Sequence, residues 1–217
     1  MDTRSAGPAA RRALHAAAVL AAAAIAAFVL VSVVHDRAEP RIEASRRAQQ
    51  LAQLTAVLGD LAYDNDPLAD TLLLRDPELL GTDQPLVAHR VRRAGTTVAV
   101  LLNAVAPDGY AGPIRLLVAV DGAGRVLGVR VLEHRETPGL GDVIEERRSD
   151  WIHGFDGRSL GDPPPDRWAV RRDGGDFDQF TGATVTPRAV VGAVRKALVY
   201  VERHRDELFE AAMPPAP

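Results

Sequence analysis

Residues 177–198 read FDQFTGATVTPRAVVGAVRKAL and join a threonine-rich turn to a long helical pattern. From Pro187 to about Phe209, apolar residues recur at the spacing of one helix face, which predicts an amphipathic helix at the end of the domain. Thr186 stands directly before Pro187, and threonine at the N-cap followed by proline is a favoured helix start. One capping hydroxyl is enough for such a start. The segment contains three threonines: Thr181, Thr184 and Thr186.

The two additional threonines have a structural and a functional interpretation. In the structural one, the segment is a tight turn followed by a capped helix. In the functional one, Thr181 and Thr184 lie beside a helix N-terminus, where backbone N–H groups and the helix dipole attract anions such as phosphate. Gly182 and Ala183 keep this loop free of bulky side chains, so that a ligand can approach the backbone. The residues alone leave both interpretations open.

The chain before this segment has the pattern of an antiparallel sheet. Apolar runs at strand spacing are separated by turn signals, including a hairpin turn at 121–124. One more short strand is expected after the three prolines at 163–165, and a helix is expected before the sheet. The predicted strands are 86–91, 97–105, 114–120, 126–132 and 168–171, and the predicted helix is 41–61. The fold class is therefore α+β, with a mostly antiparallel sheet and flanking helices.

Residues 16–34 read AAAVLAAAAIAAFVLVSVV, with Ser32 as the single polar residue. At about 1.5 Å per residue, this stretch covers most of a hydrocarbon core about 30 Å thick, which predicts a transmembrane helix. A buried core helix is rarely apolar on every face, and a cleaved signal peptide ends in small residues, unlike the exit at 33–36. We therefore expect an uncleaved single-span anchor. Arginines flank both ends almost equally, so that only the short N-terminal tail favours a cytoplasmic N-terminus.

Composition and missing motifs exclude several classes of function. The formal net charge of -3 argues against nucleic-acid binding. Without cysteine, the chain holds no thiolate zinc site and no cysteine-ligated iron–sulfur cluster. The serine-hydrolase, P-loop and HExxH patterns are absent, and His134 and His153 lack metal-ligand spacing. Neither a catalytic residue nor a metal ligand is expected, and Trp151 and Trp168 are interpreted as core or interface aromatics.

The sequence DQFTGAT at 178–184 resembles the Asp-x-x-[Ser/Thr]-Gly-Ala-Thr pattern of bacterial proteins that carry covalent FMN. This resemblance implies that a flavin transferase joins the FMN phosphate to Thr184 through a phosphoester. It also implies that the neighbouring motif residues surround the cofactor. These are Asp178, Thr181, Gly182, Ala183 and, at the helix start, Thr186.

A second segment, ETPGLG at 136–141, resembles a loop typical of FMN-binding domains. The resemblance assigns the loop to the flavin ring. Gly139 and Gly141 are expected to let the main chain pack flat against the ring, with Leu140 as an apolar contact. Glu136 and Thr137 complete the expected ring-contact loop.

From residue 106 to residue 201 the chain is similar to the G subunit of the Rnf ion-translocating electron transport complex. That family implies a redox subunit that carries electrons on covalent FMN and is not catalytic alone. It implies partner subunits with iron–sulfur and flavin centres, and electron flow coupled to ion movement. The expected location is the bacterial inner membrane, with the soluble domain on the periplasmic side.

Two alternatives stay open at this point. The C subunit of the sodium-translocating NADH:quinone reductase shares the flavin-attachment motif. A cofactor-free, membrane-anchored interaction domain would contain the same anchor and fold without the flavin.

The expected organisation has five parts. They are a cytoplasmic tail at 1–15, a transmembrane helix at 16–34, a membrane-proximal helix and linker at 35–85, an FMN-binding domain at 86–210 and a disordered tail at 211–217.

Overall fold

The computed structural model describes residues 8–210 and divides the chain into two compact units, Met1–Gln50 and Leu51–Pro217. The part of the expected linker from Leu51 onward belongs to the second unit. Residues 1–7 of the expected cytoplasmic tail and the expected disordered tail at 211–217 lie outside the described residues.

Helix α1 (Pro8–Thr55) is one uninterrupted helix and accounts for the described part of the first unit. It includes residues 8–15 of the expected cytoplasmic tail, and it continues from the apolar stretch at 16–34 into the helix predicted at 41–61. The prediction placed the end of that helix at residue 61, whereas α1 ends at Thr55. Its large apolar side chains Leu20, Ile25 and Phe28 are exposed.

Among the described residues, no helix combines the length and the apolar character that a membrane span requires.

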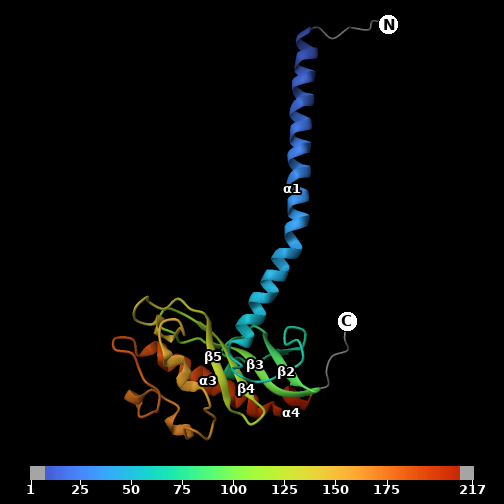
Figure 1. The fold of residues 1–217 in the computed structure, drawn as a ribbon. Coiled ribbons are helices and arrows are strands. Elements are labelled where there is room, and N and C mark those ends of the chain that lie inside the picture. Colours follow the sequence, from blue (N-terminus) through green and yellow to red (C-terminus); the bar gives the residue numbers. More distant parts are fainter. Residues whose placement is uncertain (1–7, 211–217) are drawn as a thin grey trace. The chain divides into compact units, whose positions relative to one another are not determined.

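The second unit is built on a five-stranded antiparallel sheet with the strand order β1-β2-β3-β4-β5. Figure 1 labels β2 to β5 of this sheet. Each strand pairs with the next along the chain, so that the sheet is a simple meander. Its strands are β1 (Thr71–Leu74), β2 (Leu86–Arg93), β3 (Thr96–Ala106), β4 (Ile114–Asp121) and β5 (Val126–Glu133). Four of the predicted strands are therefore confirmed, and β1 was not predicted.

Both faces of the sheet are covered by other parts of the second unit. Side chains alternate between the two faces along each strand, so that neighbouring residues belong to different clusters. On β3, Val100 and Leu102 belong to the larger apolar cluster, whereas Ala99 and Leu101 belong to the smaller one. The larger cluster includes α3 (Val185–Arg203), α4 (Arg205–Glu210) and α2 (Pro77–Leu80). The smaller cluster is closed by Leu54, Val57 and Leu58 at the end of α1 and the turn after it.

Short 3-10 turns occupy the long connection from β5 to α3. They are η1 (Asp142–Ile144), η2 (Asp150–Phe155), η3 (Pro165–Arg167) and η4 (Arg171–Asp173). The prediction of a strand at 168–171 is wrong. Val170 makes only an isolated bridge to Phe177 before η4 begins, because the chain turns back too soon to form a ladder.

The last predicted helix also differs in two respects. It begins at Val185 rather than at Pro187, and it is interrupted at His204, where α3 ends and α4 follows. Thr186 is therefore not the N-cap. It lies inside the first turn of α3 and is buried, while Thr184 occupies the N-cap position.

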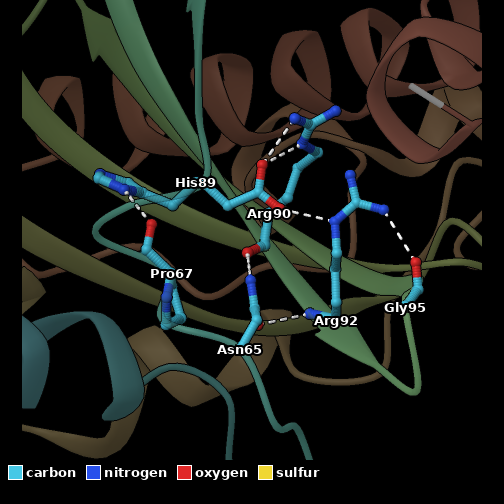
Figure 2. Close-up of polar contacts among 7 residues, drawn as sticks. Asn65, Pro67, His89, Arg90, Arg92 and Gly95 are labelled. Carbon is cyan, nitrogen blue, oxygen red and sulfur yellow. Dashed lines mark hydrogen bonds and ion pairs between the residues drawn. The ribbon is translucent and has the colours of Figure 1, made fainter. Parts of the chain in front are cut away.

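A buried polar cluster fixes the segment before β1 to the middle of β2 (Figure 2). Arg90 Nε and Arg92 Nε both donate to the carboxylate of Asp70, over 2.7 Å and 2.6 Å. All three side chains are almost fully buried. Asn65 adds two further bonds, because its amide donates to Arg90 O and accepts from Arg92 N.

Candidate functional site

The two motif segments line one pocket of the second unit, together with the turn that precedes β4. The cavity has a volume of about 510 Å³, within the usual range of small-molecule sites. Its walls come from the loop after β5, from the turn before α3 and from the turn between β3 and β4. The lining residues are Tyr110, Glu136, Thr137, Leu140, Gly141, Gly182, Ala183, Thr184, Val185 and Thr186.

Glu136 is the buried polar centre of this pocket, with 4% of its surface exposed. One carboxylate oxygen, Oε1, accepts from Ala111 N over 3.0 Å, and Oε2 accepts from the hydroxyl of Thr186. Its own backbone N–H donates to His134 Nδ1. Because a buried carboxylate is costly unless it is hydrogen-bonded, these contacts fix Glu136 in one orientation.

Gly141 makes room for that carboxylate. A Cβ at this position would lie 2.8 Å from both Cβ and Oε2 of Glu136 and 3.1 Å from the Thr186 hydroxyl oxygen. The sequence interpretation expected Gly141 to let the main chain lie flat against a ring. In the structure, its missing side chain also allows Glu136 and Thr186 to approach each other.

Thr184 holds the N-cap position of α3 with helical backbone angles, φ -84° and ψ -25°. Its side chain makes no capping hydrogen bond. An N-cap threonine ordinarily adopts extended backbone angles and uses its hydroxyl to cap the helix. The Thr184 hydroxyl therefore stands at the positive end of a 19-residue helix without that structural task.

Thr181 and Gly182 form the corner of a turn whose ends are Phe180 and Ala183, joined by a bond from Ala183 N to Phe180 O. Gly182 has φ +84°, a conformation that favours glycine in the third position of such a turn. Gly182 and Ala183 line the pocket, whereas Thr181 does not.

Asp178 lies outside the pocket and serves the fold around it. Its exposed carboxylate pairs with Arg171 over 2.9 Å, and its backbone carbonyl accepts from Trp151 Nε1 over 2.8 Å. Trp151 also packs edge-on against Phe180. Trp168 is buried against Phe177, as the core interpretation of the tryptophans expected.

The structure thus brings together Glu136, Thr137, Leu140, Gly141 and the stretch 182–186. Three expected site residues do not line the cavity: Gly139, Asp178 and Thr181. Gly139 instead donates its N–H to Asp142 Oδ1 over 2.7 Å. Two lining residues were not predicted, Tyr110 and Val185. An aromatic residue in a turn flanked by Gly109 and Gly112 was the available signal for Tyr110.

A separate groove of about 570 Å³ lies along the end of β5 and contains none of the motif residues. It is lined mostly by charged groups. The hydrogen bond from Arg147 lowers the pKa of Glu145 to about 2, and the hydrogen bond with His134 acts in the same direction against the desolvation of the carboxylate. Paired charges of this kind, close to solvent, describe a salt-bridged surface rather than a ligand site.

The pocket combines two chemically different kinds of surface. Exposed apolar side chains of Tyr110, Leu140 and Val185 suit a flat, largely apolar group. The helix start with the Thr184 hydroxyl suits an anionic group. A ligand with a planar ring and a phosphate matches both kinds of surface.

Comparison with known proteins agrees with this geometry. Residues 109–199 match the family described as the FMN-binding domain. The matched range contains all three segments that line the pocket. The second unit is therefore of the FMN-binding class.

Curated relatives define the family more closely. The G subunit of an ion-translocating oxidoreductase complex from Pseudomonas aeruginosa is 51% identical over 199 residues, covering 92% of this chain and 93% of the relative. The G subunit from Shewanella loihica is 44% identical, covering 89% of this chain and 91% of the relative. The one from Vibrio cholerae is 44% identical, covering 90% and 93%. The chain belongs to the family of G subunits of ion-translocating oxidoreductase complexes, which confirms the resemblance found in the sequence.

Proposed function

We propose that this protein carries electrons within an ion-translocating oxidoreductase complex, on FMN attached through its phosphate to Thr184. The observation that carries the proposal is the pocket itself. Two segments that are about 50 residues apart in the sequence line one cavity, and Thr186 of one segment bonds Glu136 of the other. The Thr184 hydroxyl lies at the helix start within that cavity and makes no capping hydrogen bond.

The residues present fit both the phosphate and the ring of FMN. Near Thr184, the N-terminus of α3 favours the negative charge of a phosphodiester. Gly182 leaves the approach open, because the one atom near its missing Cβ is a methyl group of Leu140 at 3.7 Å. For the ring, Leu140, Val185 and Tyr110 offer apolar surface. When bound, FMN supplies the redox chemistry, and the protein binds and orients it.

The attachment needs an activated flavin nucleotide, such as a flavin dinucleotide, and a separate transferase. In a balanced step, Thr184 Oγ forms a bond to the flavin-side phosphorus. The phosphoanhydride bond to the leaving nucleoside monophosphate breaks, and the hydroxyl proton passes to a base of the transferase. No electrons are exchanged. Thr184 is half-buried, so that an enzyme can reach it from the open side of the pocket.

We further propose that residues 16–34 anchor the chain as a single span, with the second unit on the periplasmic side of the inner membrane. The support is the nearly uninterrupted apolar sequence and the exposed side chains of Leu20, Ile25 and Phe28 on α1. Exposing each of these side chains to water costs about 25 cal/mol per Å² of apolar surface, and the hydrocarbon core of a membrane removes that cost. Electrons then pass to and from partner subunits that hold iron–sulfur and flavin centres, because this chain contains no cysteine to ligate a cluster.

The test of attachment compares threonine variants in the full chain, produced with and without a flavin transferase. Thr184→Val should fold and carry no flavin mass adduct, because it keeps the shape of the side chain and removes the hydroxyl. Thr181→Ser is the matched control and should keep the adduct, because residue 181 does not line the pocket. Peptide mass spectrometry checks both. An adduct that persists in Thr184→Val, or that maps to Thr186, would disprove the assignment.

The test of topology uses two C-terminal fusions. An alkaline phosphatase fusion should be active and a green fluorescent protein fusion should be dark, because only a periplasmic C-terminus allows the first to fold and prevents the second. The opposite pair of results would place the pocket in the cytoplasm.

A further inference from the structure

The exposed apolar side chains of the second unit are concentrated at the pocket. Its described residues include five large apolar side chains that are exposed: Leu73, Tyr110, Leu132, Leu140 and Val185. Three of the five line the pocket beside Thr184. Tyr110 is the largest of these and is 72% exposed, a costly arrangement unless another surface covers the ring.

Tyr110 is held at this place by its own loop. It lies in the turn from Gly109 to Gly112, where Gly112 N donates to Gly109 O over 3.4 Å. The next residue, Ala111, donates its backbone N–H to Glu136 Oε1 over 3.0 Å. The exposed tyrosine is therefore one residue away from a bond to a buried carboxylate.

Glu136 joins two parts of the pocket. Its Oε1 holds the turn that carries Tyr110, and its Oε2 holds Thr186 in the first turn of α3, two residues after Thr184. A single buried side chain thus fixes both the aromatic residue and the helix start that bears the attachment hydroxyl. Because Gly141 packs against the same carboxylate, the side chain has little freedom to move.

The chemistry of Tyr110 suits a ring rather than a phosphate. Its large aromatic ring stacks on planar π-systems, and its hydroxyl carries no positive charge that would favour an anion. The anionic end of the cofactor is already provided for by Thr184 and the start of α3.

We propose that Tyr110 is the aromatic contact of the flavin ring, and that Glu136 is a positioning residue which holds Tyr110 against that ring. The inference rests on the proposed attachment of FMN at Thr184 and adds how the free end of the cofactor is held. Loss of Tyr110 leaves the flavin attached but lets its ring leave the pocket.

The test uses the full flavinylated chain in detergent and measures the flavin, not the activity of the complex. Tyr110→Leu should keep the mass adduct at Thr184, while the flavin fluorescence anisotropy falls and iodide quenching increases. The unstacked fraction should rise about fivefold, the factor expected for the loss of one aromatic stack. Tyr110→Phe should retain the wild-type anisotropy, because the ring is kept. Leu132→Ser, exposed but outside the pocket, is the matched surface control and should change nothing.

The positioning role of Glu136 is tested with two variants. Glu136→Gln keeps an oxygen acceptor for Ala111 N and should retain the wild-type anisotropy. Glu136→Ala removes both bonds and should lower the anisotropy as Tyr110→Leu does, with no further decrease in the double variant. If Glu136→Ala lowers only the unfolding midpoint and leaves the anisotropy unchanged, Glu136 does not position Tyr110.

The outcomes separate the two proposals. Wild-type protein without any flavin adduct would overturn the proposed function and this inference with it. A wild-type adduct whose anisotropy and iodide quenching equal those of Tyr110→Leu would overturn the inference alone. So would a wild-type flavin as mobile and as accessible as free FMN.

Discussion

The Asp70 cluster and the pocket beside Thr184 use polar residues in opposite ways. At Asp70, the carboxylate and the two arginines are buried and bonded to one another, and Asn65 completes the network (Figure 2). At the pocket, only Glu136 and Thr186 are buried and paired. Around them lie the Thr184 hydroxyl, which caps nothing, and three exposed apolar side chains.

This difference separates a structural cluster from a candidate binding site. A buried network whose members bond one another stabilises one conformation and has nothing left to offer a ligand. A pocket that leaves apolar surface and a hydroxyl exposed keeps an unfavourable surface until a ligand covers it. Substitutions in the Asp70 cluster should therefore change the free energy of unfolding, and substitutions in the pocket should change how the cofactor is held.

The largest stability effect is expected at Asp70. Asp70→Ala leaves Arg90 and Arg92 buried without the carboxylate that they share, and should lower the free energy of unfolding by about 3–5 kcal/mol. Urea unfolding of the full chain in detergent measures this, with Trp151 and Trp168 as fluorescent reporters of the second unit. The proposed flavin adduct at Thr184 should persist under native conditions.

The matched control removes a carboxylate from the surface. Glu133 pairs with Arg115 over 3.9 Å, and both side chains are more than half exposed. Glu133→Ala should therefore cost less than about 1 kcal/mol. If both variants lost the same free energy of unfolding, burial of the Asp70 cluster would add nothing to its contribution to stability.

A smaller effect is expected where the pocket itself is part of the packing. Gly141→Ala places a methyl group 2.8 Å from Glu136, and the neighbouring atoms must move. The cost should be about 1–3 kcal/mol, the range for inserted core methyl groups. The same variant should shift the flavin absorption spectrum, because Glu136 holds two parts of the pocket. Gly154→Ala, which meets no atom within 4 Å, is the control and should leave both unchanged. A normal spectrum in a destabilised Gly141→Ala would separate Glu136 from the cofactor.

The smallest effect concerns pH near the Asp70 cluster. Burial lowers the pKa of His89 below its usual 6.5, although the hydrogen bond between Nδ1 and Pro67 O acts in the opposite direction (Figure 2). The unfolded chain then takes up a proton near pH 6.5 that the folded chain does not. Stability should fall as the pH drops below about 6.5, and it should fall less steeply in His89→Gln. Unfolding free energies between about pH 8 and about pH 5 measure this. Identical slopes in the two proteins would contradict the assignment.

The sheet could be predicted because its strands are long and bounded by turn signals. β2 to β5 are each at least 8 residues long and contain several apolar residues, and the 121–124 turn contains two glycines. β1 could not be predicted, because TLLL is too short to show a period and its pairing with β2, for example of Leu74 with Leu86, leaves no local pattern in the sequence.

The site was predictable only where a motif marks it. The threonine motif identifies Thr184, but local rules favoured Thr186 as the N-cap because it precedes proline. In the structure the helix starts earlier, and the hydroxyl of Thr186 bonds Glu136 instead of capping, a contact across 50 residues that no local rule contains. Tyr110 was missed for a related reason. Its importance depends on Ala111 meeting the same distant carboxylate.

The turn after α1 has a consequence for the order in which the protein is made. Val57 O lies 2.7 Å from the place where a Cβ of Gly128 would be, and Ala56 O accepts from Arg130, 74 residues further along the chain. The ribosome therefore produces Leu54, Val57 and Leu58 long before β4 and β5, the strands that they cover. Until β5 emerges, these apolar side chains have no native partner on it. Such long-range contacts slow folding, and a nascent chain that pauses before β5 leaves this half of the core open to other molecules.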